Sequence, residues 1–156
     1  MQRPEVVVAA IIFNSKNEVL LCKSEKWLNK YVVPGGHVEG GETLEEALIR
    51  EVKEETNLGV YDLSLVALKD TAQNISELNP KSGYPVAKHY IVFDFTCKTN
   101  DNIVKLNHEA SEYVWIALPE VFSFDLAPYT HAFFKAYMEG ASKLKKMIIY
   151  NGAVGK

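Results

Sequence analysis

The stretch GHVEGGETLEEALIREVKEETNL, Gly36–Leu58, predicts a glycine-rich turn followed by an amphipathic helix. Thr43 is placed to begin that helix, because its hydroxyl can accept a hydrogen bond from the Glu46 amide while the Glu46 carboxylate reaches back. At about 100° per residue, the apolar side chains of the helix form one stripe. Its members are Leu44, Ala47, Leu48 and Val52.

Three carboxylates, Glu51, Glu54 and Glu55, fall within or beside the same arc of the helix. Their spacing of i, i+3 and i+4 brings the side chains together on one patch. Clustered carboxylates beside an apolar face repel one another and lose hydration, so they need protons or cations. Arg50 supplies only one positive charge, and carboxylate ligands suit Mg²⁺ or Mn²⁺. Taken alone, the three glutamates also fit an ordinary solvated acidic face.

The whole stretch resembles the signature of the Nudix hydrolases, G-x5-E-x7-R-E-U-x-E-E-x-G-U, where U is bulky and aliphatic. The positions that match in register are Gly36, Glu42, Arg50, Glu51, Val52, Glu54, Glu55 and Leu58. The sequence departs from the signature at Asn57, where the family carries Gly. Asn is the next best residue for a left-handed cap at a helix end, so the departure affects loop geometry and not the chemistry.

The composition fits one soluble domain spanning residues 1–156, with 47% hydrophobic and 24% charged residues. A net charge of -3 argues against a general nucleic-acid or membrane-surface binder. No stretch approaches the length of a membrane span. Cys22 and Cys97 each lie in an apolar run, which predicts buried free thiols and suits a reducing cytoplasm.

Elsewhere the pattern predicts strands, a long polar loop at residues 70–85, and a helix near the end of the chain. A hairpin is expected at the start, where the polar turn Asn14–Asn17 separates two apolar runs. The predicted strands are Val6–Phe13, Glu18–Lys23, Val60–Lys69, Val86–Thr99 and Ile103–Leu106, and the helix is Pro128–Met138. In the strand Val86–Thr99, alternation places His89 on the apolar face and Asp94 on the polar one.

A second patch, LNHEASEYVWIALPE at Leu106–Glu120, is similar to the family's loop with a distal acid followed by an aromatic-x-Trp strand. The resemblance implies that this acid completes the metal site or acts as general base. Glu109 lies in the loop and is the first candidate. Glu112 begins the strand and is the second.

Three other segments are implicated by the resemblance. The Tyr31–Gly36 approach implies the Gly35 carbonyl as a metal ligand and close approach of the Gly36 backbone to ion and phosphate. Lys23, at the end of a strand, is either a phosphate contact or a solvated edge lysine. Tyr84, in the long loop, either stacks on a base or anchors the loop.

The implied fold is the α/β Nudix fold, an α/β/α sandwich with a mixed sheet between helices. The implied reaction is hydrolysis of a nucleoside diphosphate linked to another moiety, with Mg²⁺ or Mn²⁺ held by Glu51, Glu54 and Glu55. Arg50 would orient a glutamate of the signature, and Glu51 or Glu109 would deprotonate the attacking water.

The short chain favours a nucleoside triphosphate as the small-molecule substrate, as in MutT-like proteins. A sugar nucleotide or a dinucleoside polyphosphate is the next candidate. A nucleotide-binding module without hydrolysis is expected to lose acids of the signature, and this chain keeps them. Cleavage of RNA 5′ ends would need a basic groove, which the net charge does not indicate. A homodimer is an expectation drawn only from similar proteins.

Overall fold

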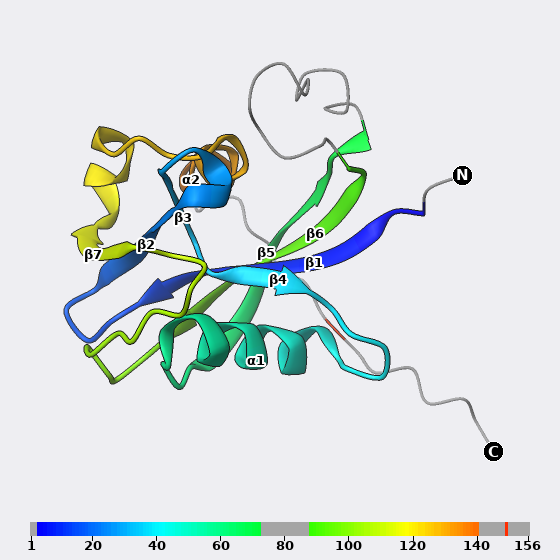
Figure 1. Ribbon diagram of the computed structural model, residues 1–156, viewed down its shortest axis with the longest axis horizontal. Helices are drawn as coiled ribbons and strands as arrows, with labels where there is room; N and C mark the ends of the chain where they lie inside the picture. Colours follow the sequence, from blue (N-terminus) through cyan, green and yellow to red (C-terminus); the bar gives the residue numbers. More distant parts are fainter. Residues whose placement is uncertain (1–2, 73–87, 141–148, 150–156) are drawn as a thin grey trace.

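The computed structural model describes residues 3–72, 88–140 and 149. Among them, seven strands form one mixed sheet, with α1 on one face and α2 on the other (Figure 1). The elements in chain order are β1 (Glu5–Phe13), β2 (Glu18–Ser24), the 3₁₀ helix η1 (Glu25–Trp27), β3 (Lys30–Val32), β4 (Gly35–His37), α1 (Leu44–Thr56), β5 (Tyr61–Asp70), β6 (Tyr90–Lys98), β7 (Glu112–Ala117), the 3₁₀ helix η4 (Leu118–Ser123) and α2 (Pro128–Gly140).

Strand β1 is the centre of the sheet. It runs parallel to β6 along its whole length, and β5 pairs antiparallel with the far side of β6. On its other edge β1 pairs with β4 at Val7–Ala9 and with β2 only at Phe13. β2 therefore turns away from β1 and forms an antiparallel unit with β3 and β7.

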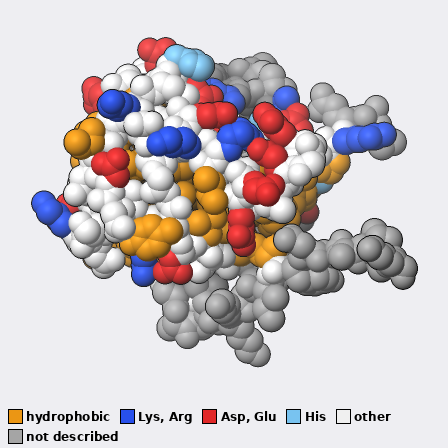
Figure 2. Space-filling model, turned by 90° about the horizontal axis from the view of Figure 1, so that it is seen from below, with side chains coloured by type: hydrophobic (Ala, Val, Ile, Leu, Met, Phe, Trp, Pro, Cys, Tyr) orange, Lys and Arg blue, Asp and Glu red, His pale blue; other side chains and the backbone are white. Residues whose placement is uncertain are grey.

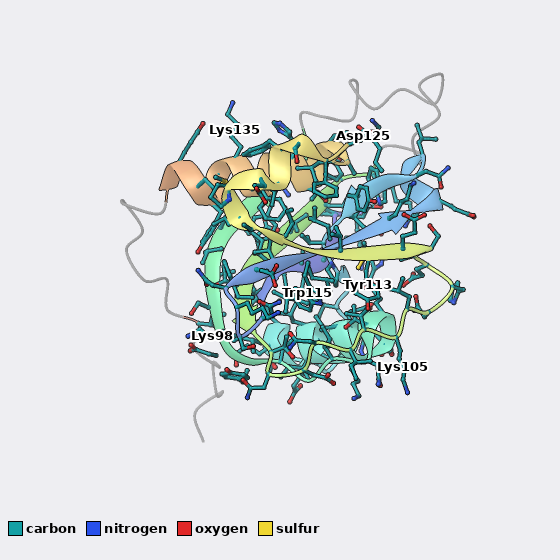
Figure 3. The ribbon with its side chains drawn as sticks, turned by 90° about the vertical axis from the view of Figure 1, so that its left-hand side faces the viewer. Lys98, Lys105, Tyr113, Trp115, Asp125 and Lys135 are labelled. Carbon is teal, nitrogen blue, oxygen red and sulfur yellow. The ribbon has the colours of Figure 1, made fainter. Side chains whose placement is uncertain are left out.

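Two hydrophobic cores lie on opposite faces of the sheet, because the side chains of β1 alternate. Val8, Ala10 and Ile12 pack with the apolar stripe of α1. Ile11 points the other way and packs with Phe133 and Phe134 of α2. Seen from the side, the sheet lies between the two helices (Figure 3). The predicted α/β/α sandwich is confirmed.

The ends of α1 are as the sequence predicts. The Thr43 hydroxyl accepts a hydrogen bond from the Glu46 amide, and the Glu46 carboxylate accepts one from the Thr43 amide. At the C-terminus Asn57 has a φ of 62° and donates its N–H to the Lys53 carbonyl. This left-handed cap is the conformation for which the family uses Gly.

Two local predictions need correction. The glycine-rich turn expected from Gly36 onward forms at Gly40 and Gly41, whereas Gly36, like Gly35, belongs to strand β4 and pairs with Val8. Ile103–Leu106 is not a strand, since the Lys105 amide donates to the carbonyl of Thr56 at the end of α1. This segment runs beside α1, where Figure 3 shows Lys105. Val104 and Leu106 pack in the core with α1, whereas Ile103 is exposed. A short apolar run does not distinguish such a segment from a strand.

The polarity assigned to β6 is also wrong at one residue. Asp94 is only 1% exposed, although alternation placed it on a polar face. Both faces of β6 are covered, since Phe95 packs in the core beneath α1 while Asp94 lies on the side of α2. His89 is not in the core, and its ring nitrogen lies 2.8 Å from the Asp70 carboxylate. Strand β6 begins at Tyr90 instead of Val86, which lies outside the described residues.

The prediction of buried free thiols is confirmed. Both cysteines are free and buried, and burial raises the pKa of each thiol to about 12. The face of the molecule seen from below in Figure 2 carries acidic, basic and hydrophobic side chains intermingled. None of the described helices is long and apolar enough to cross a membrane.

Candidate active site

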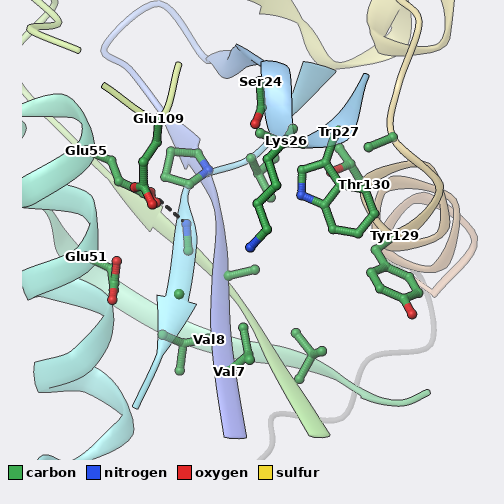
Figure 4. A pocket seen from close by; sticks show the side chains of 18 of the residues that line it. Val7, Val8, Ser24, Lys26, Trp27, Glu51, Glu55, Glu109, Tyr129 and Thr130 are labelled. Atoms are coloured by element: carbon green, nitrogen blue, oxygen red, sulfur yellow. Dashed lines mark hydrogen bonds between the residues drawn. The ribbon is translucent and has the colours of Figure 1, made fainter. Parts of the chain in front are cut away.

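A pocket of about 530 Å³ lies between α1, strands β1 and β4, η1 and the start of α2. Its two ends differ in character (Figure 4). Glu51, Glu55 and Glu109 line one end, and Trp27 and Tyr129 line the other. The volume is within the usual range for small-molecule sites, roughly 300–1,000 Å³.

The acidic end is held by backbone as well as by side chains. Glu55 projects from the last turn of α1, and its Oε2 accepts a hydrogen bond of 2.9 Å from the Gly35 N–H. Glu109 reaches the same place from the loop before β7 (Figure 4). That loop is tied to α1, because the Asn107 N–H donates to the Glu55 carbonyl, 3.3 Å away.

Burial and a hydrogen bond with the Glu109 carboxyl together raise the pKa of Glu55 to about 9, while the Gly35 N–H opposes the shift. Burial also raises the pKa of Glu51, against the lowering effect of Arg50. Carboxylates that lose hydration next to one another favour their protonated forms. This end of the pocket therefore holds protons when no cation neutralises it.

On the outer side of the acidic end, Arg50 hydrogen-bonds to several groups at once. Its guanidinium donates two hydrogen bonds to Glu42, one to Glu51 Oε1 at 2.9 Å and one to Glu54 Oε2 at 3.3 Å. A further hydrogen bond, of 3.0 Å, goes to the His37 carbonyl at the end of β4. Because of the Arg50 hydrogen bonds, the pKa of Glu42 falls to about 2. The arginine thus joins the loop, β4 and α1 around Glu51.

The glycines of β4 let backbone pass where no side chain fits. A Cβ on Gly36 would lie 2.4 Å from the Glu51 carboxyl carbon. A Cβ on Gly35 would lie 2.3 Å from the Val8 carbonyl oxygen of the neighbouring strand. Gly36 therefore makes room for the Glu51 side chain, whereas Gly35 makes room for the neighbouring strand of the sheet.

The other end of the pocket is mainly apolar. Val7 and Val92 form its floor, and Trp27 and Tyr129 meet edge to face with ring centroids 5.6 Å apart. Polar residues also line it, among them Ser24, Thr130, Lys69 and Asp94. Lys69 and Asp94 join β5 to β6.

A sequence model of the NUDIX domain matches residues 3–138 of the chain. The chain belongs to the NUDIX domain family. The m7GpppN-mRNA hydrolase NUDT17 of Xenopus laevis is 33% identical over 123 residues, which is 72% of this chain and 41% of that protein. The chain thus spans less than half the length of this relative.

Two further relatives match along most of their length. The nucleoside triphosphatase NudI of Escherichia coli O139:H28 is 28% identical over 80% of this chain and 89% of its own. The crystal structure of a MutT protein from Methanosarcina mazei Go1 is 26% identical, with a TM-score of 0.67, over 92% of this chain and 99% of that one.

The Nudix signature is brought together largely as predicted. Glu51, Glu55, Glu109, Gly35 and Gly36 all line the pocket. Their roles as metal ligands and catalytic groups stay predictions, and so does the Gly35 carbonyl as a ligand, because the contact present is made by its N–H.

Other predicted site residues lie elsewhere. The Glu54 side chain is 56% exposed, pairs with Arg50 and does not line the pocket. Lys23 is also outside it, with its Nζ 4.0 Å from the exposed carboxylate of Glu112, the second candidate for the distal acid. Tyr84 lies outside the described residues.

Lys26, Lys69 and Asp94 are among the pocket residues that the sequence analysis did not predict. Lys26 follows β2 on η1 and projects between the two ends of the pocket (Figure 4). Lys69 and Asp94 lie on adjacent strands, where Asp94 pairs with Ala67 and Lys69 pairs with Val92, and the Lys69 Nζ lies 3.5 Å from Asp94 Oδ2. The signal in the sequence for Asp94 was a charged residue in an otherwise apolar strand. Alternation explained it as a residue on the polar face.

The oxygen-only donors of the acidic end match what Mg²⁺ and Mn²⁺ prefer. Among the described residues, no group of three or more acidic, histidine or cysteine side chains is gathered closely enough to hold an ion as the side chains stand. The reason lies in their present partners: Arg50 holds Glu51, whereas Gly35 and Glu109 hold Glu55. A cation there would replace the shared protons, and so the donors fit one chemically.

Proposed function

We propose that this chain is a Mg²⁺- or Mn²⁺-dependent Nudix hydrolase that cleaves the pyrophosphate bond of a nucleoside diphosphate linked to another moiety. The observation that carries the proposal is the convergence of Glu51, Glu55 and Glu109 at one end of a pocket able to hold a nucleotide. The raised pKa values of Glu51 and Glu55 support it, because perturbed carboxyls in a cleft are typical of functional sites.

A divalent cation bound at this end would neutralise phosphate charge and lower the pKa of a bound water. Glu51, Glu55 and Glu109 would hold it, with the Gly35 carbonyl and Glu54 as further predicted ligands. Glu54 would have to leave Arg50 and turn inward to join them.

The protein groups have separable tasks. Glu51 or Glu109 is the general base, since both carboxylates line the pocket. Arg50 is a positioning residue that fixes Glu51 through a 2.9 Å hydrogen bond and is itself clamped by Glu42. The bare backbone at Gly36 lets phosphate approach closely. Lys26, between the ends of the pocket, is placed to meet phosphate charge.

A nucleoside triphosphate is our first choice of substrate. The E. coli relative named as a nucleoside triphosphatase aligns along 89% of its own length, which supports this choice. The frog relative is named as a hydrolase of m7GpppN-mRNA, which keeps a cap-like dinucleoside polyphosphate as the second candidate. We also propose that residues 1–156 act as one domain. The cytoplasmic location and a homodimer stay predictions.

The test is release of phosphate or pyrophosphate with Mg²⁺ from nucleoside triphosphates, sugar nucleotides and dinucleoside polyphosphates, for the wild type and Glu55→Gln. Glu55→Gln should lower kcat by at least about 100-fold, the usual scale for losing a positioned acid–base or ligand group. Glu45→Gln is the matched control, because Glu45 is an exposed glutamate of the same helix outside the pocket.

Turnover of one substrate class, lost only in Glu55→Gln, would establish the reaction and its substrate together. If nothing is turned over with Mg²⁺ or Mn²⁺ while nucleotides still bind, the hydrolase proposal falls and a nucleotide-binding module replaces it.

A further inference from the structure

Asp94 is a buried carboxylate with a spare acceptor. The residue is 1% exposed, and its Oδ1 has no hydrogen-bond partner among the described residues. A buried polar atom without a partner is destabilising. Such atoms are rare in native proteins, and a ligand, an ion or an ordered water is the usual missing partner. Asp94 also lines the pocket, so a bound molecule can supply the missing donor.

The residues beside Asp94 on the neighbouring strands are small. Its register partners are Ala9 on β1 and Ala67 on β5, and directly paired residues point to the same face of a sheet. The long side chain that lies against the Asp94 carboxylate is Lys69, which contacts Oδ2 and not Oδ1.

Lys69 Nζ and Asp94 Oδ1 together offer a bound molecule one donor and one acceptor. The Lys69 Nζ lies 3.5 Å from Asp94 Oδ2 and donates to the Tyr129 carbonyl at 3.3 Å. The same ammonium lies over the rings of Tyr129 and Phe133, 5.6 Å and 5.8 Å from their centroids. The pocket floor thus presents an acceptor, Oδ1, beside a donor whose position is fixed from three sides.

We propose that the Asp94–Lys69 pair is the specificity determinant of this pocket and reads the donor–acceptor edge of a nucleobase. The ring of the base would rest against the wall made by Trp27 and Tyr129. A flat heteroaromatic ring with a few polar edge atoms matches an apolar wall above one acceptor and one donor.

The burial of Asp94 raises the pKa of its carboxyl to about 6, with Lys69 opposing the shift. The carboxylate is still ionised at neutral pH and acts there as an acceptor. The inference rests on the proposed function for the identity of the reaction, but recognition of the base can be measured without turnover.

The test compares bases that invert the same edge. Cytosine and uracil differ in this way, as do adenine and hypoxanthine, because an amino group beside a ring acceptor becomes an oxo group beside a ring N–H. Asp94→Asn keeps the volume and turns its amide oxygen toward Lys69, which places an NH₂ where Oδ1 was. The ratio of kcat/KM within at least one pair of nucleoside triphosphates should change by about tenfold or more, through KM.

Asp62→Asn is the matched control. Asp62 also pairs with a lysine across β5 and β6, with its Oδ2 3.1 Å from Lys98 Nζ, but it is exposed and outside the pocket. This variant should leave every ratio unchanged. Inorganic tripolyphosphate, which has no base, should be handled equally by the wild type and Asp94→Asn.

Ratios that stay within twofold in Asp94→Asn would overturn the proposal. If that variant does not fold by circular dichroism, Lys69→Gln takes its place with the same expectation. Equal affinity of the wild type for tripolyphosphate and nucleoside triphosphates would also overturn it, without any variant.

Failure of this inference and failure of the hydrolase proposal are distinguishable. If the wild type cleaves nothing, the same pairs are compared by isothermal titration calorimetry in magnesium-free buffer, where base recognition still gives a ratio of Kd values. If the wild type cleaves nucleotides but shows no preference among bases, only the role of Asp94 and Lys69 falls.

Discussion

The pKa values of two glutamates of the signature are shifted in opposite directions. Hydrogen bonds from Arg50 lower one, and burial raises the other. Glu42 accepts two hydrogen bonds from Arg50, which lower its pKa to about 2. Glu55 is largely buried beside Glu109, and its pKa rises to about 9. At neutral pH without a cation, Glu42 is therefore ionised and Glu55 keeps its proton. Glu42 holds Arg50 in place, whereas Glu55 can exchange its proton for a bound cation.

Glu55 makes the metal-free protein sensitive to alkali. Its folded-state pKa of about 9 lies above the ordinary 4.5, so the native state binds more protons than the unfolded state between these values. The stability from protonated Glu55 is complete below about pH 4.5 and is lost as pH rises toward 9. With a chelator present, the wild type should lose stability relative to Glu55→Gln over this range, at no more than about 1.4 kcal/mol per pH unit.

Urea unfolding at several pH values checks this expectation. The informative quantity is the difference between the two proteins, since Asp94 and Glu51 also titrate abnormally and contribute to both curves. Parallel curves for wild type and Glu55→Gln would show that Glu55 is ionised throughout.

Strand β4 is the element in which fold and site meet. It pairs with β1, its Gly35 N–H holds Glu55, and its His37 carbonyl receives Arg50. The two glycines have different neighbours, and so the same substitution should have different consequences at each.

Gly36→Ala should impair activity while the fold survives. The new Cβ would lie 2.4 Å from the Glu51 carboxyl, a flexible group that can move aside but would leave its place in the site. A displacement of about 1 Å near the chemistry can cost about 100-fold in rate. Gly35→Ala instead meets the Val8 carbonyl at 2.3 Å and should destabilise the protein by about 1–3 kcal/mol or more.

Thermal unfolding and steady-state kinetics of both variants separate the two effects. A Gly36→Ala protein with normal kcat and KM would contradict the close approach between β4 and Glu51. An unchanged melting temperature in Gly35→Ala would show that β1 and β4 can move apart without cost.

At the scale of the whole molecule, the candidate site joins segments that are far apart in the chain. Glu51 and Glu55 come from α1, Gly35 from β4, and Glu109 from the loop before β7. A cation bound by these groups would link the segments in the folded state only. Binding to the native state alone stabilises a protein by about 2.7 kcal/mol at one hundred times the Kd.

Mg²⁺ should therefore raise the melting temperature of the wild type by several degrees, in steps that follow its concentration. Glu55→Gln should respond much less, and the control Glu45→Gln should respond like the wild type. Differential scanning calorimetry with and without a chelator makes the measurement. An equal rise in all three proteins would mean that the ion binds elsewhere.

The sequence alone determined what depends on neighbours along the chain. The Thr43–Glu46 capping box, the left-handed cap at Asn57 and the strand Val6–Phe13 follow from local sequence, and each is confirmed. The Nudix signature could also be recognised from the sequence alone. The spacing of Glu51 and Glu55 on one helix places both side chains in the same pocket.

Only the tertiary structure decided what depends on contacts between distant segments. Ile103–Leu106 has a strand-like pattern, but Lys105 in it finds its backbone partner at the end of α1. Asp94 lies in a strand whose two faces are both covered, and Lys26 lines the pocket from the short helix η1, which carries no motif. Burial, pKa and access to a pocket are set by which surfaces meet in space, and a local pattern does not contain that information.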